Sequence, residues 1–219
     1  MTNKHILGIA FGFTAGYVDT LGFVALFGLF TAHVTGNFVL IGSELVHPSH
    51  GVLLKFLAFP AFIFAVAVAR VISIRFESKG RSPANALIVL QLLLLMAFML
   101  SGLFSTFYER INQAPLILAG VAGAAAMGIQ NAASRLVWTE LAPTTVMTGN
   151  VTQIVIDVVD LLSGSTLPNI KTRLLKFLWP LVAFGIGAVS GAFTYQYIGF
   201  FALLLPMLIL FFILVSFSK

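Results

Sequence analysis

The tripeptide Thr-Gly-Asn occurs twice in this chain, as Thr35, Gly36 and Asn37 and again as Thr148, Gly149 and Asn150. Glycine lets a chain turn sharply, and Thr or Asn can cap the first free N–H groups of a helix. A helix that begins in an apolar environment presents open N–H donors and a positive dipole end. The two copies therefore predict two helix starts that hold an anion or a polar solute. In the alternative, the caps satisfy only their own helices.

Asp19 is the sharpest single candidate, because it lies inside the apolar segment 6–30. An ionised carboxylate in the middle of a membrane helix costs at least about 2.5 kcal/mol. Asp19 is therefore predicted to bind a proton, a cation or a polar solute, with interhelical hydrogen bonding as the alternative. Asn131 holds the corresponding place in the second half of the chain, beside Gln130. We expect Asp19, Gln130 and Asn131 to face the two helix starts.

Two further acids follow the tripeptides at helical spacing. The two sets at i, i+4 and i+7 are Asn37, Ile41 and Glu44, and Asn150, Ile154 and Asp157. This spacing places each set on one helix face. Together with Asp19, the acids Glu44 and Asp157 are predicted to line an ion or proton pathway. In the alternative they are solvated ends of short helices.

Histidine and the standard catalytic motifs give weaker signals. His33 could be a pH-sensitive gate, but a lone histidine is more often a hydrogen-bonded packing residue, which we favour. His47 and His50 have a metal-binding spacing but lack a third ligand in sequence reach. No catalytic triad, phosphate-binding loop or dinucleotide motif is present. We therefore expect no enzyme activity, cofactor or bound metal.

The composition indicates an integral membrane protein. Apolar residues make up 59% of the chain, charged residues only 9%, and mean hydropathy is +1.05. The net charge is +5, but the basic residues are too few to suggest nucleic-acid binding. The chain has no cysteine. The partners expected are the lipid bilayer and an unknown small polar solute or ion. Six long apolar spans are predicted at about 6–30, 52–73, 84–107, 115–138, 174–196 and 198–217, with shorter stretches at 36–46 and 149–162.

The positions of the basic residues indicate whether the short stretches cross the membrane or are re-entrant. The two basic loops hold Arg70, Arg75, Lys79 and Arg81, and Lys171, Arg173 and Lys176. If both short stretches are re-entrant, these loops fall on one side together with Lys4 and Lys219. That arrangement follows the positive-inside rule and predicts six spans, with both termini cytoplasmic. An eight-span alternative stays open.

An internal duplication extends beyond the tripeptides. At an offset of 112, the stripe Gly8, Gly12 and Gly16 corresponds to Gly120, Ala124 and Gly128, and Asp19 corresponds to Asn131. The fold class predicted is all-α, a single membrane domain of residues 1–219 with repeat 1 at about 1–108 and repeat 2 at about 114–219. Each repeat holds three spans, an odd number, so the second must be inverted. Small-residue stripes allow close helix packing, and we expect the first stripe to pack on its repeat partner. Gly187 and Gly191 serve another helix pair or a homodimer.

Three motifs resemble the signature of the YoaK family of small bacterial inner-membrane proteins. They are Gly16-Tyr17-Val18-Asp19, His33-Val34-Thr35-Gly36-Asn37 and Met147-Thr148-Gly149-Asn150-Val151. The resemblance covers essentially the whole chain and implies a multi-pass membrane protein with about six spans. It implies no substrate, reaction or site residue, since the domain is named for its unknown function.

Two functions fit these observations. The first is a small-solute or ion transporter or channel with one pseudo-symmetric site near the membrane midplane. The second is a non-transporting membrane scaffold or accessory subunit, in which the polar residues hold the bundle together.

Overall fold

The computed structural model describes residues 3–47, 51–108, 113–165 and 167–216, and every regular element within them is helical. The elements are α1 (Asn3–Ala25), α2 (Gly36–Val46), α3 (Val52–Glu77), α4 (Ala84–Tyr108), α5 (Ala114–Leu136), α6 (Met147–Leu162), α7 (Ile170–Ile198), the 3-10 helix η1 (Gly199–Leu203) and α8 (Leu204–Ser216). The prediction of an all-helical chain is confirmed.

The first helix is shorter than the apolar run from which it was predicted. Helix α1 ends at Ala25 rather than near residue 30, because Phe27 and Gly28 have left-handed φ angles of 52° and 77°. The chain turns back there and reaches α2 at Gly36. The apolar residues that follow α1 therefore form a packed loop.

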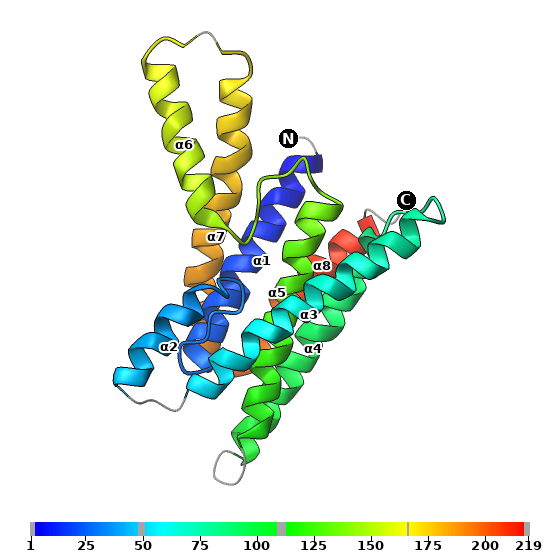
Figure 1. Cartoon of the computed structure of the whole chain (residues 1–219), viewed down its shortest axis with the longest axis vertical. Coiled ribbons are helices and arrows are strands. Elements are labelled where there is room, and N and C mark those ends of the chain that lie inside the picture. Colours follow the sequence, from blue (N-terminus) through cyan, green and yellow to red (C-terminus); the bar gives the residue numbers. More distant parts are fainter. Residues whose placement is uncertain (1–2, 48–50, 109–112, 166, 217–219) are drawn as a thin grey trace.

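Five stretches are long and apolar enough to cross a membrane, in the part of the chain that the structure describes. The fifth, Ile170–Ser216, joins α7, η1 and α8. In Figure 1 the chain reverses at η1, so that α7 descends and α8 returns toward the end that holds the amino terminus. The fold is that of a multi-pass helical membrane protein.

The closest helix pairing joins α1 to α7. Gly12 and Gly16 of α1 lie against the backbone of Pro180 and Phe184, so that no side chain separates the two helices. Gly187 and Gly191 of α7 lie in the same way against the backbone of α1. The expectation that the first glycine stripe packs on its repeat partner α5 is therefore wrong. The close packing that small residues permit is present, but with α7.

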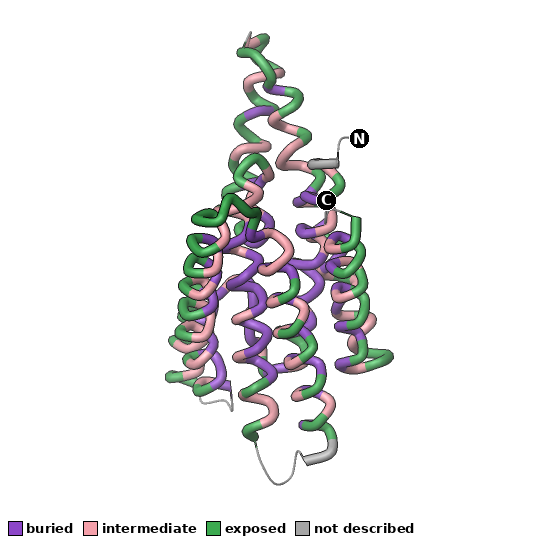
Figure 2. Tube along the Cα trace, turned by 90° about the vertical axis from the view of Figure 1, so that its right-hand side faces the viewer, coloured by how far each residue is buried: buried purple, intermediate pink, exposed green. Residues whose placement is uncertain are grey.

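Helix α5 forms the centre of the other half, where it packs against α3 and α4. Twelve of its residues are buried, most of them alanine or glycine. Figure 2 shows this buried interior as a vertical band, with exposed residues along the outer helices. The exposed outer residues are largely apolar, which suits contact with lipid.

The two short helices run in opposite directions from the middle of the molecule. In Figure 1, α2 runs downward, whereas α6 runs upward beside the first part of α7. Both ends of the chain, the α3–α4 loop and the α6–α7 loop lie toward the upper end. The two basic segments thus gather at the same end of the molecule.

Candidate solute site between the two short helices

A cavity of about 310 Å³ lies where α2 and α6 begin. Both halves of the chain contribute to its wall. The lining residues are Ala32, His33, Val34, Thr35, Phe59, Phe62, Asn131, Thr145, Val146, Met147 and Thr148. The two Thr-Gly-Asn segments are thus brought to one cavity, although they lie in opposite halves of the sequence.

Asp19 of α1 holds the loop that leads into α2. Its side chain is buried, and Oδ1 accepts a hydrogen bond of 2.6 Å from the N–H of Ala32. Longer contacts of 3.4 Å and 3.5 Å join Oδ1 to the hydroxyl of Thr31 and the N–H of His33. The carboxylate therefore satisfies loop donors that a membrane would leave without water.

His33 links this carboxylate to the cavity. Its Nδ1 lies 2.6 Å from Oδ2 of Asp19, and its side chain is 35% exposed. The ring also meets Phe184 of α7 edge-on, with 5.7 Å between the centroids. Asp19 does not line the cavity itself but contacts two residues that do, Ala32 and His33.

Asn131 and Thr145 form the equivalent contact in the second half. Asn131 Nδ2 donates to Thr145 Oγ1 at 2.6 Å, and both partners line the cavity. This contact spans 14 residues, as does the contact between Asp19 and His33. One side of the cavity thus carries an ionisable pair and the other a neutral pair.

The two tripeptide asparagines bind their own loops. Asn37 donates to the carbonyl of Phe30 at 2.8 Å and accepts from its N–H at 2.9 Å. Asn150 donates to the carbonyl of Pro143 at 2.7 Å. Proline has no backbone N–H, so it cannot donate a second hydrogen bond to the Asn150 side chain. Each bond spans seven residues, and both asparagines are buried. They close the loops and do not line the cavity.

The expected side-chain caps are not formed, and the starts of α2 and α6 differ. Neither helix has a side-chain cap hydrogen bond at its N-cap residue. At α2, the N–H groups of Gly36, Asn37 and Phe38 donate to loop carbonyls at 2.8–3.2 Å. Within the described residues, the amides of Thr148 and Gly149 make no such bond to the loop before α6. Open N–H donors were predicted at both helix starts. Of these two starts, that of α6 has them and that of α2 does not.

The other candidate side chains lie around the cavity or away from it. Thr35 and Thr148 line it, Gly36 packs beside Phe30, and Gly149 faces open space. Gln130 is buried and donates to Phe11 O at 2.9 Å and to Thr144 Oγ1 at 3.2 Å. It also accepts a 2.8 Å bond from Gln91, so that it ties α1, α4 and α5 together.

Glu44 and Asp157 are each engaged with a cation away from the cavity. Glu44 Oε1 lies 2.6 Å from the ammonium of Lys55. Asp157 is buried and binds Arg173 through Nη2 at 2.7 Å and Nε at 2.9 Å, and it accepts from Gln153 at 2.7 Å. Their place in an ion or proton pathway stays a prediction.

His33 lines the cavity and forms the kind of hydrogen-bonded contact that the favoured interpretation expects of it. No sequence pattern near His33 indicates Asp19 as its partner. The metal candidate His47 has its intended partner, His50, outside the described residues. No cluster of three potential metal ligands occurs within the residues that the structure describes.

The long apolar helices of the fold define the class, a multi-pass helical membrane protein. The chain belongs to the family described as "Protein of unknown function (DUF1275)", which matches residues 7–216. The resemblance to the YoaK family is thereby confirmed, since the YoaK family is a DUF1275 family. No curated protein and no solved structure matches the chain.

Proposed function

We propose that this protein is a carrier or channel for a small polar solute or ion, with its binding site in the cavity between α2 and α6. The observation that carries the proposal is the meeting of two oppositely directed short helices at one cavity that has both polar and apolar walls. Short helices that begin at membrane depth are a recurring way to bind solutes in transporters. The site includes no catalytic set, and the proposed function is not enzymatic.

The inverted repeat is part of the proposal. The repeat relates α1 to α5, α2 to α6 and α3 to α7. The contact of α1 with α7 therefore corresponds to the contact of α5 with α3. In the same way, the contact of α2 with α3 corresponds to that of α6 with α7. Gly16 meets the carbonyl of Phe184, and its repeat equivalent Gly128 meets that of Phe62. These paired contacts support two structural repeats of opposite orientation, each with three spans and one half-helix.

The orientation follows from charge. The basic segments lie at the end that carries both termini, and positive loops favour the cytoplasm. We place that end in the cytoplasm of a bacterial cell and assign the protein to the inner membrane. A homodimer through exposed helix faces is compatible with this orientation.

The chemistry of the site favours a solute with hydrogen-bonding groups. Hydroxyls of Thr35 and Thr148 and the amide of Asn131 line the cavity, whereas charge is confined to Asp19 and His33. One proton on this pair changes its net charge from negative to neutral. Proton binding there would couple solute affinity to the proton gradient.

Ligand-induced thermal stabilisation tests the site. Purified wild type and Asp19→Asn are heated in detergent with a panel of amino acids, sugars, polyols and inorganic ions. A solute that raises the melting temperature of wild type but not of Asp19→Asn supports the site. Equal stabilisation of both proteins would show that Asp19 is not part of the solute site.

The second candidate is a scaffold or accessory subunit. The observation that favours it is the saturation of the Asp19 carboxylate by loop donors, which is a structural role. A scaffold predicts that Asp19→Asn lowers the melting temperature while no solute changes it.

A further inference from the structure

The loops before α2 and α6 close against the helix bundle to different degrees. Leu29 of the first loop is fully buried and, together with Leu54, fills the space over Gly120 of α5. At the repeat offset of 112, Leu29 corresponds to Leu141 and Gly120 corresponds to Gly8. Leu141 and Gly8 instead line a hollow of about 150 Å³.

Lys55 completes the closed arrangement. Its side chain is 1% exposed, although it lies in the first turn of α3. The ammonium donates to the carbonyl of Phe27 in the first loop and forms the 2.6 Å ion pair with Glu44 of α2. One cation thus joins α3, the loop and the short helix.

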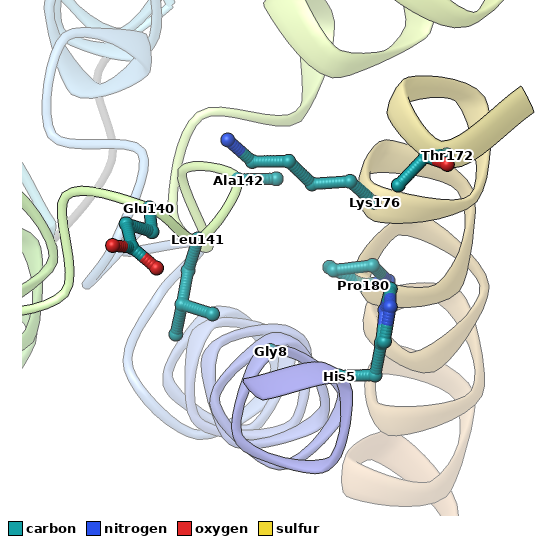
Figure 3. Close-up of a pocket in the computed structure, with 8 residues that line it drawn as sticks. All are labelled: His5, Gly8, Glu140, Leu141, Ala142, Thr172, Lys176 and Pro180. Carbon is teal, nitrogen blue, oxygen red and sulfur yellow. The ribbon is translucent and has the colours of Figure 1, made fainter. Parts of the chain in front are cut away.

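Lys176 holds the corresponding position on α7, in a Lys-Phe-Leu sequence that repeats the one at Lys55. It lines the hollow with Glu140, and Figure 3 shows its side chain extending from α7 toward the loop at Ala142. Within the described residues, Lys176 forms no ion pair. The acid that corresponds to Glu44, Asp157, binds Arg173 instead.

The hollow and the central cavity share one loop. Leu141 and Ala142 line the hollow, and Thr145 and Val146 of the same loop line the cavity. Movement of this loop would therefore change both. The first loop has the same relation to the cavity, because Leu29 packs at its start and Ala32–Thr35 line the site.

We infer that these two loops are the alternating gates of the site, with Lys55 and Lys176 as their latches. In this structure the Lys55 latch closes the Glu44 end, and the Lys176 end is open as the hollow. In the opposite state, Lys176 binds backbone carbonyls of the Trp138–Ala142 segment and Lys55 leaves Phe27. This inference rests on the proposed function, because inverted repeats that exchange conformations give alternating access.

Thiol labelling tests the gates in this chain, which has no cysteine of its own. Leu29→Cys and Leu141→Cys occupy equivalent positions, and a membrane-impermeant maleimide is applied to right-side-out and inside-out vesicles. We expect labelling of Leu141→Cys from the side of the termini and none of Leu29→Cys from either side. Equal labelling of the two cysteines would overturn the assignment of open and closed ends.

Neutralising the latch provides the second arm. The double variant Lys55→Met, Glu44→Gln removes the ion pair without leaving a lone buried charge. We expect Leu29→Cys to become labelled from the side opposite the termini as the open state is populated, and Leu141→Cys labelling to fall. Asp157→Asn is the matched control and leaves Leu29→Cys unlabelled. A rise at both cysteines would mean general loosening and would overturn the gate.

Labelling reports exposure and not flux, so the two proposals fail separately. Reciprocal labelling in a protein that moves no solute contradicts transport and leaves the paired loops as a conformational switch. Solute flux without reciprocal labelling contradicts the latches and leaves the transporter.

Discussion

The imidazole of His33 lies against the carboxylate of Asp19, with 2.6 Å between Nδ1 and Oδ2. The same carboxylate accepts the N–H of Ala32, the residue before His33. One buried acid thus fixes both the backbone and the side chain of a loop that lines the cavity. This places the loop conformation and the charge of the site under the control of a single group.

Asp19 and His33 are expected to be energetically coupled. We predict that Asp19→Asn, His33→Gln and the double variant give a coupling energy of about 1–3 kcal/mol, because each single change breaks the same partly buried contact. The measurement is a double-mutant cycle of unfolding free energies in detergent. Additive effects within error would show that the 2.6 Å contact does not contribute.

The two tripeptide asparagines provide a matched pair of variants. Asn37→Ala loses two hydrogen bonds to the backbone of Phe30, whereas Asn150→Ala loses one to the carbonyl of Pro143 and a 3.4 Å contact with the Met147 sulfur, which is a weak acceptor. We expect Asn37→Ala to be the more destabilising by about 1 kcal/mol, the net value of one hydrogen bond. Thermal unfolding of the two variants decides this, and the reverse order would contradict the loop-closing role.

Because α1 packs closely on α7, the effect of a Gly→Ala substitution on stability should depend on its position. A Cβ at Gly16 would collide with the backbone of Phe184, whereas Gly185 faces open space. Gly16→Ala should cost about 1–3 kcal/mol, as expected for overpacking, and Gly185→Ala should be neutral. Folded yield and melting temperature give the comparison. A neutral Gly16→Ala would rule out the tight helix pairing.

The α6–α7 hairpin depends on a buried carboxylate. Arg173→Ala leaves the carboxylate of Asp157 without its cation and should destabilise the hairpin. Lys171→Ala, on the same helix turn and exposed, is the control. Limited proteolysis between α6 and α7 should become faster only in Arg173→Ala. Resistance equal to wild type would show that the pair is dispensable.

The helices were predictable because their apolar runs and breaks are local properties of the sequence. The stretch 36–46 is α2 itself, and Asp19 and Asn131, which the offset of 112 pairs, each contact a residue 14 positions further along the chain. The partner of the glycine stripe was not predictable from the stripe. A flat helix face permits close approach, but tertiary topology decides that α7 lies there.

The fine structure of the site depends on loop conformation, which the sequence does not reveal. The asparagines were expected to cap helices, but in the folded loops their side chains bind the backbone of Phe30 and Pro143 instead. The contact of His33 with Asp19 was not predictable, because it requires the chain to reverse at Phe27 and Gly28. Both differences come from contacts between residues that become neighbours only after the loops fold.

Solute uptake into proteoliposomes tests the central claim, that the cavity between α2 and α6 is a transport site. The solute is one that stabilises wild type against heat, and the proteins compared are wild type, Asp19→Asn and the Gly185→Ala control. We predict that Asp19→Asn lowers uptake at least about tenfold, equivalent to about 1.4 kcal/mol, while the control retains it. Unchanged uptake by a well-folded Asp19→Asn protein would contradict the account.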